Sequence, residues 1–177
     1  MYKDTLNPTK LKNYAGTKRT FYIALAADVD VWPVLTDPIV NPADLVTFEA
    51  AFTMKLGKRF WKFEVMVRKN KMTFTGAGQR GSKSFINRVE LIRTDQSAEL
   101  LGWITSYMSQ PIVVIGQTLD GDLRVFGTDD LPAFMEEFEG DGGADVSDAK
   151  ETKIIIESVG DPAGFYTGLT VPLTPAV

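Results

Sequence analysis

The sequence contains neither cysteine nor histidine, and this absence removes most enzyme chemistries at once. Without these residues there is no disulfide, no thiolate nucleophile, no Ser-His or Cys-His pair and no ordinary zinc or iron site. No apolar run is long enough to span a bilayer, and residues 1–16 lack the apolar core of a secretory signal. Carboxylate pairs, lysines and hard cations remain as alternatives, but we expect a protein with no catalytic residue, no cofactor and no metal ion, and without a membrane contact.

The composition is that of an ordinary globular chain. Its 177 residues are 44% hydrophobic and 24% charged, which is enough to build a sizeable core, and no boundary divides the chain, so we expect one domain over 1–177. The formal net charge of -4 argues against a general nucleic-acid binder, because such a protein needs a basic face to release counterions from phosphates. Local basic patches remain possible.

Residues 82–127 predict a strand, a helix and a hairpin in that order. The unbroken apolar run 112–115 indicates a strand covered on both faces, and Asp120-Gly121 allows the positive φ of a tight turn. A helix near 96–109 is expected to begin at a cap, Thr94 or Asp95, and to end before Pro111. Its apolar side chains at helical spacing should pack on a sheet: Leu100, Leu101, Ile104 and Met108.

Two alternating segments, 45–56 and 61–67, predict a long antiparallel hairpin that turns at Gly57. One face of this hairpin is apolar and the other is mostly polar. The polar face supplies the candidate lumen-facing residues of a tubular assembly: Thr47, Glu49, Thr53, Lys62 and Glu64.

The whole pattern predicts a mainly β fold with one helix. We expect about eight antiparallel strands in a β-sandwich or rolled barrel over residues 19–158, in which 131–139 is either a strand or a short helix. Residues 1–17 are expected to form an N-terminal arm. Residues 159–177, with three prolines, are expected to form an extended C-terminal tail.

Residues 28–44 form a loop that is both rich in proline and unusually apolar. Three prolines exclude a helix and a central strand, yet the segment is too apolar for a solvated linker. Either its own domain or a neighbouring subunit must cover it. The candidate subunit contacts are Trp32, Pro33, Leu35 and Ile39, together with Arg80 from the glycine-rich loop 76–81.

Three motifs suggest chemistry but fit a structural interpretation better. The G-x-G-x-x-G of 76–81 precedes a β-patterned segment, whereas a dinucleotide site needs a helix there, so we expect a loop between strands. Asp141, Asp145 and Asp148 do not follow the EF-hand order, although calcium binding remains an alternative. Neighbouring glutamates at 136, 137 and 139 mostly point apart on a strand. The three tryptophans are better explained as core or interface anchors than as a sugar platform.

The order of elements resembles the tail-tube proteins of bacteriophages over residues 19–168, and is similar to structural proteins of phages of Bacteroidetes-type hosts. The likeness is carried by the alternating pair 46–67, by SFINRVEL, ELLGWITSYM and PIVVIGQTLDGDLRVFG, by the Gly/Asp loop, and by TKIIIESVGDPAGFYTG. This resemblance implies a virion protein, assembled in the host cytoplasm, that forms homo-oligomeric rings, commonly hexamers.

The resemblance also implies partners and a location. The rings would stack into a tail tube that contacts neighbouring tail or connector proteins, and genomic DNA would pass through the lumen without sequence-specific binding. In that family a long hairpin lines the bore; here five basic residues in and beside the predicted hairpin depart from a uniformly non-basic wall: Lys55, Lys58, Arg59, Lys62 and Arg68. The alternatives are a head–tail connector or terminator ring of the same fold, or a calcium- or carbohydrate-binding β-sandwich.

Overall fold

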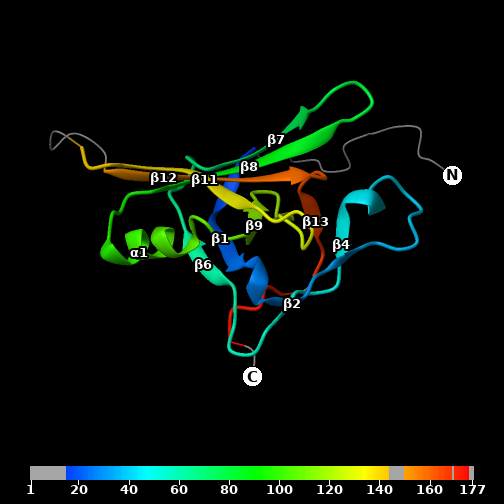
Figure 1. The fold of residues 1–177 in the computed structure, drawn as a ribbon, viewed down its shortest axis with the longest axis horizontal. Helices are drawn as coiled ribbons and strands as arrows, with labels where there is room; N and C mark the ends of the chain where they lie inside the picture. The colour runs from blue at the N-terminus through cyan, green and yellow to red at the C-terminus, as the bar shows by residue number, and fades with distance from the viewer. Residues whose placement is uncertain (1–14, 144–149, 169, 176–177) are drawn as a thin grey trace.

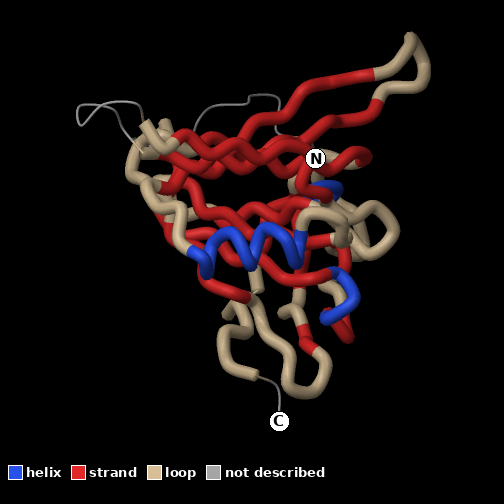
Figure 2. Tube along the Cα trace, turned by 60° about the vertical axis from the view of Figure 1, so that its left-hand side comes forward, coloured by secondary structure: helices blue, strands red, loops and turns tan. Residues whose placement is uncertain are grey.

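The computed structural model describes residues 15–143, 150–168 and 170–175. These residues form thirteen strands in three sheets and one α-helix, which confirms the mainly β class with a single helix. The sheets do not close into a barrel, so the sandwich is the form present. Figures 1 and 2 show the four-stranded sheet as one layer and the seven-stranded sheet as the layer beneath it. The expected arm 1–17 lies mostly outside the described residues, and Thr17 already begins the first strand.

The seven-stranded sheet is the centre of the molecule. Its strand β9, Ile112–Thr118, is buried from both sides: Ile112 and Val114 face the first core cluster, whereas Val113 and Ile115 face the second. The expectation for the run 112–115 is therefore confirmed. The hairpin turn at Gly121, with φ of 101°, connects β9 to β10 as predicted. In sheet order the strands are β3 (Val34–Leu35), β4 (Thr47–Glu49), β13 (Gly164–Tyr166), β10 (Leu123–Phe126), β9, β1 (Thr17–Leu25) and β6 (Trp61–Glu64).

The four-stranded sheet covers one face of this central sheet. It is antiparallel throughout and contains β11 (Phe134–Asp141), β12 (Glu151–Gly160), β8 (Ser84–Arg93) and β7 (Lys71–Ala77), in that order. Phe21 of β1 packs with Val89 of β8 and Ile156 of β12 in the core between the layers. The β7–β8 turn contains residues 78–81, whereas Gly76 and Ala77 end β7, so the loop expected between two strands at 76–81 is confirmed for its last four residues. Its tip projects beyond the body of the molecule (Figure 1).

A second core lies on the other face of the seven-stranded sheet. A two-stranded sheet of β2 (Val29–Val31) and β5 (Thr53–Met54) covers it, together with the aromatic rings of Phe52 and Phe60. Tyr166 of β13 connects the segment of Phe52 to the segment of Thr170. Its hydroxyl accepts a hydrogen bond from the Phe52 amide (3.2 Å) and donates to the Thr170 carbonyl (3.1 Å). Two short 3₁₀ helices, η1 (Ala26–Asp28) and η2 (Asp44–Val46), connect these elements.

The predicted hairpin 45–67 is wrong. β4 pairs with β3 and β13, β5 pairs with β2, and β6 pairs with β1. Phe52 and Phe60 enter the second core, whereas Phe63 enters the first, so the chain between them crosses from one side of the central sheet to the other. The alternation identified strand residues only in part, at 47–49, 53–54 and 61–64, and each of these short strands pairs with a distant part of the chain.

The expected C-terminal tail 159–177 is also corrected. β12 continues to Gly160, and β13 pairs antiparallel with β10 and parallel with β4. Gly164 is required beside β4, because a Cβ there would lie 2.1 Å from the ring of Phe48. The segment between β12 and β13 is held by Asn87, whose amide group donates to the Asp161 carbonyl (2.8 Å) and accepts from the Ala163 amide (3.0 Å).

We predict that Asn87→Ala lowers the free energy of unfolding by about 3 kcal/mol, since the side chain is only 2% exposed and its loss removes the partner of the buried Ala163 amide and of the Asp161 carbonyl. Urea denaturation measures this change. Ser84→Ala, in the same strand but half-buried, is the control and should change stability by less than about 0.5 kcal/mol. Equal effects of the two substitutions would show that the Asn87 contacts do not stabilise this segment.

The helix α1 spans Ala98–Tyr107, inside the expected range 96–109. Its cap is Ser97, whose hydroxyl accepts from the Leu100 amide (3.2 Å), rather than Thr94 or Asp95. Leu100 and Ile104 are buried as predicted, but Leu101 and Met108 are exposed, and Tyr107 is buried in their place.

Candidate assembly surfaces

Both outer strands of the four-stranded sheet have an open edge. Among the described residues β11 pairs only with β12, and β7 pairs only with β8. The outer edge of each of these two strands therefore carries backbone N–H and C=O groups that form no hydrogen bond to another strand. The two strands are eight and seven residues long. Proteins commonly shorten, twist or cover such edges, because an open edge is a template for pairing with another chain. Two long open edges on one sheet indicate an assembly surface.

The two edges carry opposite charge. Residues 68–83, which contain β7, include five basic side chains and no acidic one. β11 contains four acidic side chains and no basic one, and the acidic run continues in the sequence from 129 to 148. We call these the basic edge (68–83) and the acidic edge (134–141). The basic edge of one copy is therefore complementary to the acidic edge of another, which favours head-to-tail contact over contact of like edges.

Each edge also exposes a phenylalanine on the same face of the sheet. By register Phe74 of β7 lies opposite the buried Asn87, and Phe138 of β11 lies opposite the buried Ile154, so both rings are on the core-facing side. The central sheet does not reach them, and they are 63% and 53% exposed. Joining of the two edges would therefore remove large apolar groups from water beside the new backbone hydrogen bonds.

The outward face of the four-stranded sheet is polar and negative. The strand register places six carboxylates and three basic groups on it. Arg88 lies between Glu157 (3.2 Å) and Glu137 (3.8 Å), and Lys153 pairs with Glu90 (3.2 Å), so two of the three cations are already neutralised by neighbours. The charged residues that the register places on this face are Glu90, Glu137, Glu139, Asp141, Glu151, Glu157, Lys71, Arg88 and Lys153, and Lys69 of the basic edge pairs with Glu151.

A third surface is a groove of about 340 Å³ between β6 and α1. We call it the aromatic groove, since Phe63 and Trp103 lie with ring centroids 4.9 Å apart and Trp103 stacks on Tyr107 at 4.7 Å. Burial, and then the negative charge of Asp28, raise the pKa of the Tyr107 hydroxyl. Trp61 forms the rim, and the Arg59 guanidinium lies 4.3 Å over its ring. Arg59 thus covers one face of this indole, which remains 48% exposed.

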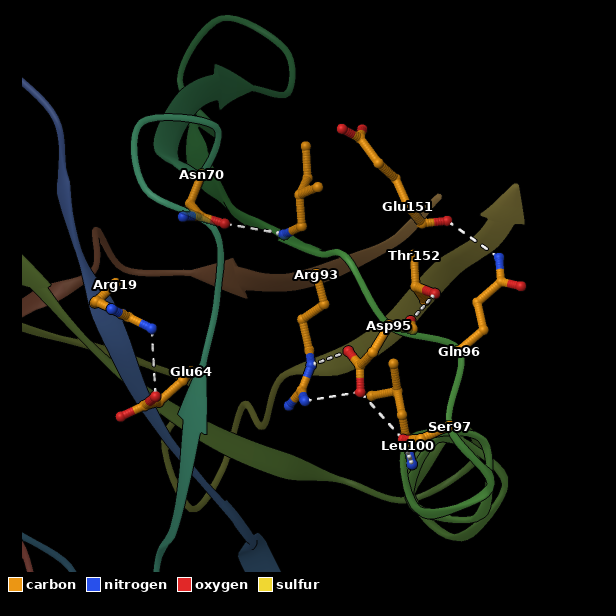
Figure 3. Close-up of polar contacts among 11 residues, drawn as sticks. Arg19, Glu64, Asn70, Arg93, Asp95, Gln96, Ser97, Leu100, Glu151 and Thr152 are labelled. Carbon is orange, nitrogen blue, oxygen red and sulfur yellow. Dashed lines mark hydrogen bonds and ion pairs between the residues drawn. The ribbon is translucent and has the colours of Figure 1, made fainter. Parts of the chain in front are cut away.

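A chain of polar contacts fixes α1 beside β6 and so shapes the groove (Figure 3). Arg93 lies over the ring of Phe63 and donates two hydrogen bonds to Asp95, at 2.7 and 2.9 Å. These bonds lower the pKa of the Asp95 carboxyl. Asp95 also accepts from the hydroxyl of Ser97, the cap of α1, and its carbonyl accepts from the Thr152 hydroxyl of β12 (2.8 Å). The helix is thus bonded to the four-stranded sheet at its first turn.

A projecting segment, residues 34–46, carries a large apolar surface; we call it the apolar loop. Val34, Ile39, Val40 and Leu45 are all more than half exposed. The loop is nevertheless ordered, because the Asp44 carboxylate accepts from the amides of Asn41 (2.7 Å) and Val40 (2.9 Å), which lowers the pKa of Asp44. It lies at the right of Figure 1, whereas α1, which forms one wall of the aromatic groove, lies at the left.

The structure separates the predicted site residues. The candidate lumen residues do not share one face: Thr47 and Glu49 are on β4, Thr53 is on β5, and Lys62 and Glu64 form an ion pair (2.8 Å) on β6. Of the candidate subunit contacts, Trp32 is half-buried against Phe52 and Pro33 is buried, so their own domain covers them. Leu35, Ile39 and Arg80 are exposed.

The sequence contained the signal for the two charged edges, but sequence reasoning missed it. The runs 68–83 and 129–148 each contain charge of one sign, and only the sheet order places them at opposite edges. No sequence pattern indicated that Phe63 and Trp103 form a groove, because the two residues become neighbours only through the packing of α1 on β6.

The described residues contain no group of three or more acidic side chains placed to hold a metal ion. Asp141 lies in β11, and Asp145 and Asp148 lie outside the described residues. None of the helices in the described ranges has the length and apolar character needed to cross a membrane. In comparisons with protein-family models, curated proteins and solved structures, the chain matches none of them.

Proposed function

We propose that this protein is a structural subunit that assembles into closed rings, and that the rings stack into the tail tube of a bacteriophage. The observation that carries the proposal is the pair of open, oppositely charged edges on one four-stranded sheet. An acidic edge and a basic edge on the same sheet favour heterologous, head-to-tail contacts. Such contacts generate a ring when the rotation between neighbours closes. A ring of sheets would leave no edge unpaired.

The negative outward face supports the role of a DNA conduit. A ring closed through the two edges places all the outward faces of the four-stranded sheets on one wall, with the bulk of each subunit behind them. A wall with six carboxylates and four cations, Lys69 included, has a net negative charge and repels phosphates, so DNA could move past it without being held. The four-stranded sheet thus replaces the 45–67 hairpin as the proposed lumen wall.

A connector or terminator ring is the second candidate, since it would use the same edges but would not stack with copies of itself. The apolar loop and the aromatic groove are the surfaces that bear on this choice, because they lie near opposite ends of the strands (Figure 1).

Sedimentation velocity over a range of protein and salt concentrations tests the ring. We expect one large species of defined mass at low salt and high protein concentration, and its dissociation as salt rises, since the Debye length falls from about 10 Å at 0.1 M to about 3 Å at 1 M. A chain that remains a monomer at every concentration at low salt would contradict the proposal. A species of ring mass that salt does not weaken would contradict the role of the charged edges.

A further inference from the structure

The aromatic groove and the apolar loop have complementary shapes and chemistry. The groove is a concave surface with apolar walls, and the loop is a convex apolar projection on the same chain. The groove volume of about 340 Å³ is large enough for more than one aliphatic side chain. Within one molecule the two surfaces lie at opposite ends, so they cannot contact each other in the same copy (Figure 1).

Charge favours the same pairing. The loop, 34–46, contains Asp37 and Asp44 and no basic residue. The groove is bordered by Arg59, Lys62 and Arg93, and Glu99 is the one acidic residue of its lining. Lys62 is paired with Glu64 (2.8 Å) and Arg93 with Asp95 (2.7 Å), so the Arg59 guanidinium over Trp61 is the border cation placed to attract the two aspartates of the loop.

The loop is already ordered for binding. Besides the Asp44 contacts, the Thr47 hydroxyl donates to the Ala43 carbonyl (2.8 Å), and the Thr36 hydroxyl donates to the Glu49 carboxylate (3.0 Å). An ordered loop loses less conformational entropy on docking than a mobile one, so more of the apolar burial appears as affinity.

We infer that the apolar loop of one copy docks in the aromatic groove of a second copy, and that this contact joins consecutive rings. The strands of the four-stranded sheet run along the long axis of the molecule, with the groove near one end and the loop near the other (Figure 1). Ring neighbours would lie across the strands, so the strand ends point above and below the ring, with the tilt usual in closed sheets. The statement that this contact joins consecutive rings rests on the proposed ring. The pairing of the apolar loop with the aromatic groove does not depend on it.

Disulfide formation tests the pairing, because the native chain contains no cysteine. Ile39→Cys is mixed with Ser106→Cys, which changes an exposed residue of the groove lining, or with the control Thr105→Cys, an exposed neighbour outside it. Under mild oxidation we expect a covalent heterodimer that forms at least tenfold faster with Ser106→Cys. Equal rates, or no heterodimer, would overturn the inference.

Electron microscopy of Ile39→Asp separates this inference from the proposed ring. We expect single rings and no tubes, whereas the control Leu173→Asp, an exposed leucine of the C-terminal segment, should form tubes like the native chain. Tubes formed by Ile39→Asp would overturn the inference and leave the ring proposal intact. Absence of rings from the native chain itself would overturn the ring proposal, while the disulfide result still decides the loop–groove pairing.

Discussion

Reversal of charge on either edge of the four-stranded sheet is expected to abolish ring formation, and mixing the two reversed proteins is expected to restore it. Glu136→Lys, Glu139→Lys and Asp141→Lys together make both edges basic, and Arg68→Glu, Lys71→Glu and Arg80→Glu together make both edges acidic. In a ring of either reversed protein alone, two edges of the same charge would face each other at every contact and would repel. In an equal mixture each contact again joins an acidic edge to a basic edge, and a ring of even number closes with alternating subunits.

The control for this experiment carries the same charge change outside the edge. Asp30→Lys, Asp129→Lys and Asp130→Lys together alter three exposed residues outside β11, and rings should persist. Native mass spectrometry can weigh each species, since the reversed proteins differ in mass. Rings from either reversed protein alone would contradict the role of the edges, and so would a mixture that remains monomeric.

Phe21→Ala is expected to have the largest effect on stability, about 4 kcal/mol, because Phe21 is fully buried between the two sheets. Phe21 lies opposite Gly116 of β9. A Cβ at Gly116 would lie 2.7 Å from the Phe21 ring and 2.5 Å from the sulfur of Met72, so Gly116→Ala should destabilise by about 2 kcal/mol through overpacking.

The two substitutions should be coupled. Once the Phe21 ring is removed, the methyl group that Gly116→Ala introduces occupies part of the vacated space, so the double variant should lose less stability than the two single variants together. Urea denaturation of all three proteins at low concentration measures this coupling. Leu101→Ala, at an exposed position of α1, is the control and should change stability by less than about 0.5 kcal/mol. Strict additivity would show that a side chain at position 116 does not contact the Phe21 ring.

Local patterns predicted several elements because their causes are local. In a strand, the four consecutive apolar residues 112–115 place apolar side chains on both faces, so both faces must be buried. The structure buries one face in the first core cluster and the other in the second. Asp120-Gly121 makes a turn because glycine accepts positive φ. The helix was found from its apolar spacing. Its buried stripe, however, includes Tyr107 rather than Met108, because the aromatic ring packs on Trp103 and lies next to β6.

Strand pairing could not be predicted in the same way. Alternation in 45–67 shows which side chains share a face, but it carries no information on the partner strand. Trp61 lies opposite Ile23 of β1, and Phe48 lies opposite Tyr166 of β13, contacts that span long stretches of chain. Both pairings depend on burial of Phe52 and Phe60 in the second core, which only the completed fold provides.

The candidate surfaces were predictable only in part. Ile39 is exposed in the proline-containing stretch that follows β3, and Leu35 is exposed because β3 is the outermost strand of its sheet, whereas Trp32 and Pro33 turn back onto their own domain. The charged edges needed the order β11-β12-β8-β7, because the two charged runs are separate in the sequence and acquire their complementary positions through the sheet.

Negative-stain electron microscopy of the purified native protein over a concentration series tests the central claim most directly. Rings with a central hole, of one symmetry and with stacked tubes at the highest concentrations, are the result that we predict. Single particles of the size of one 19.5 kDa chain at every concentration would contradict it.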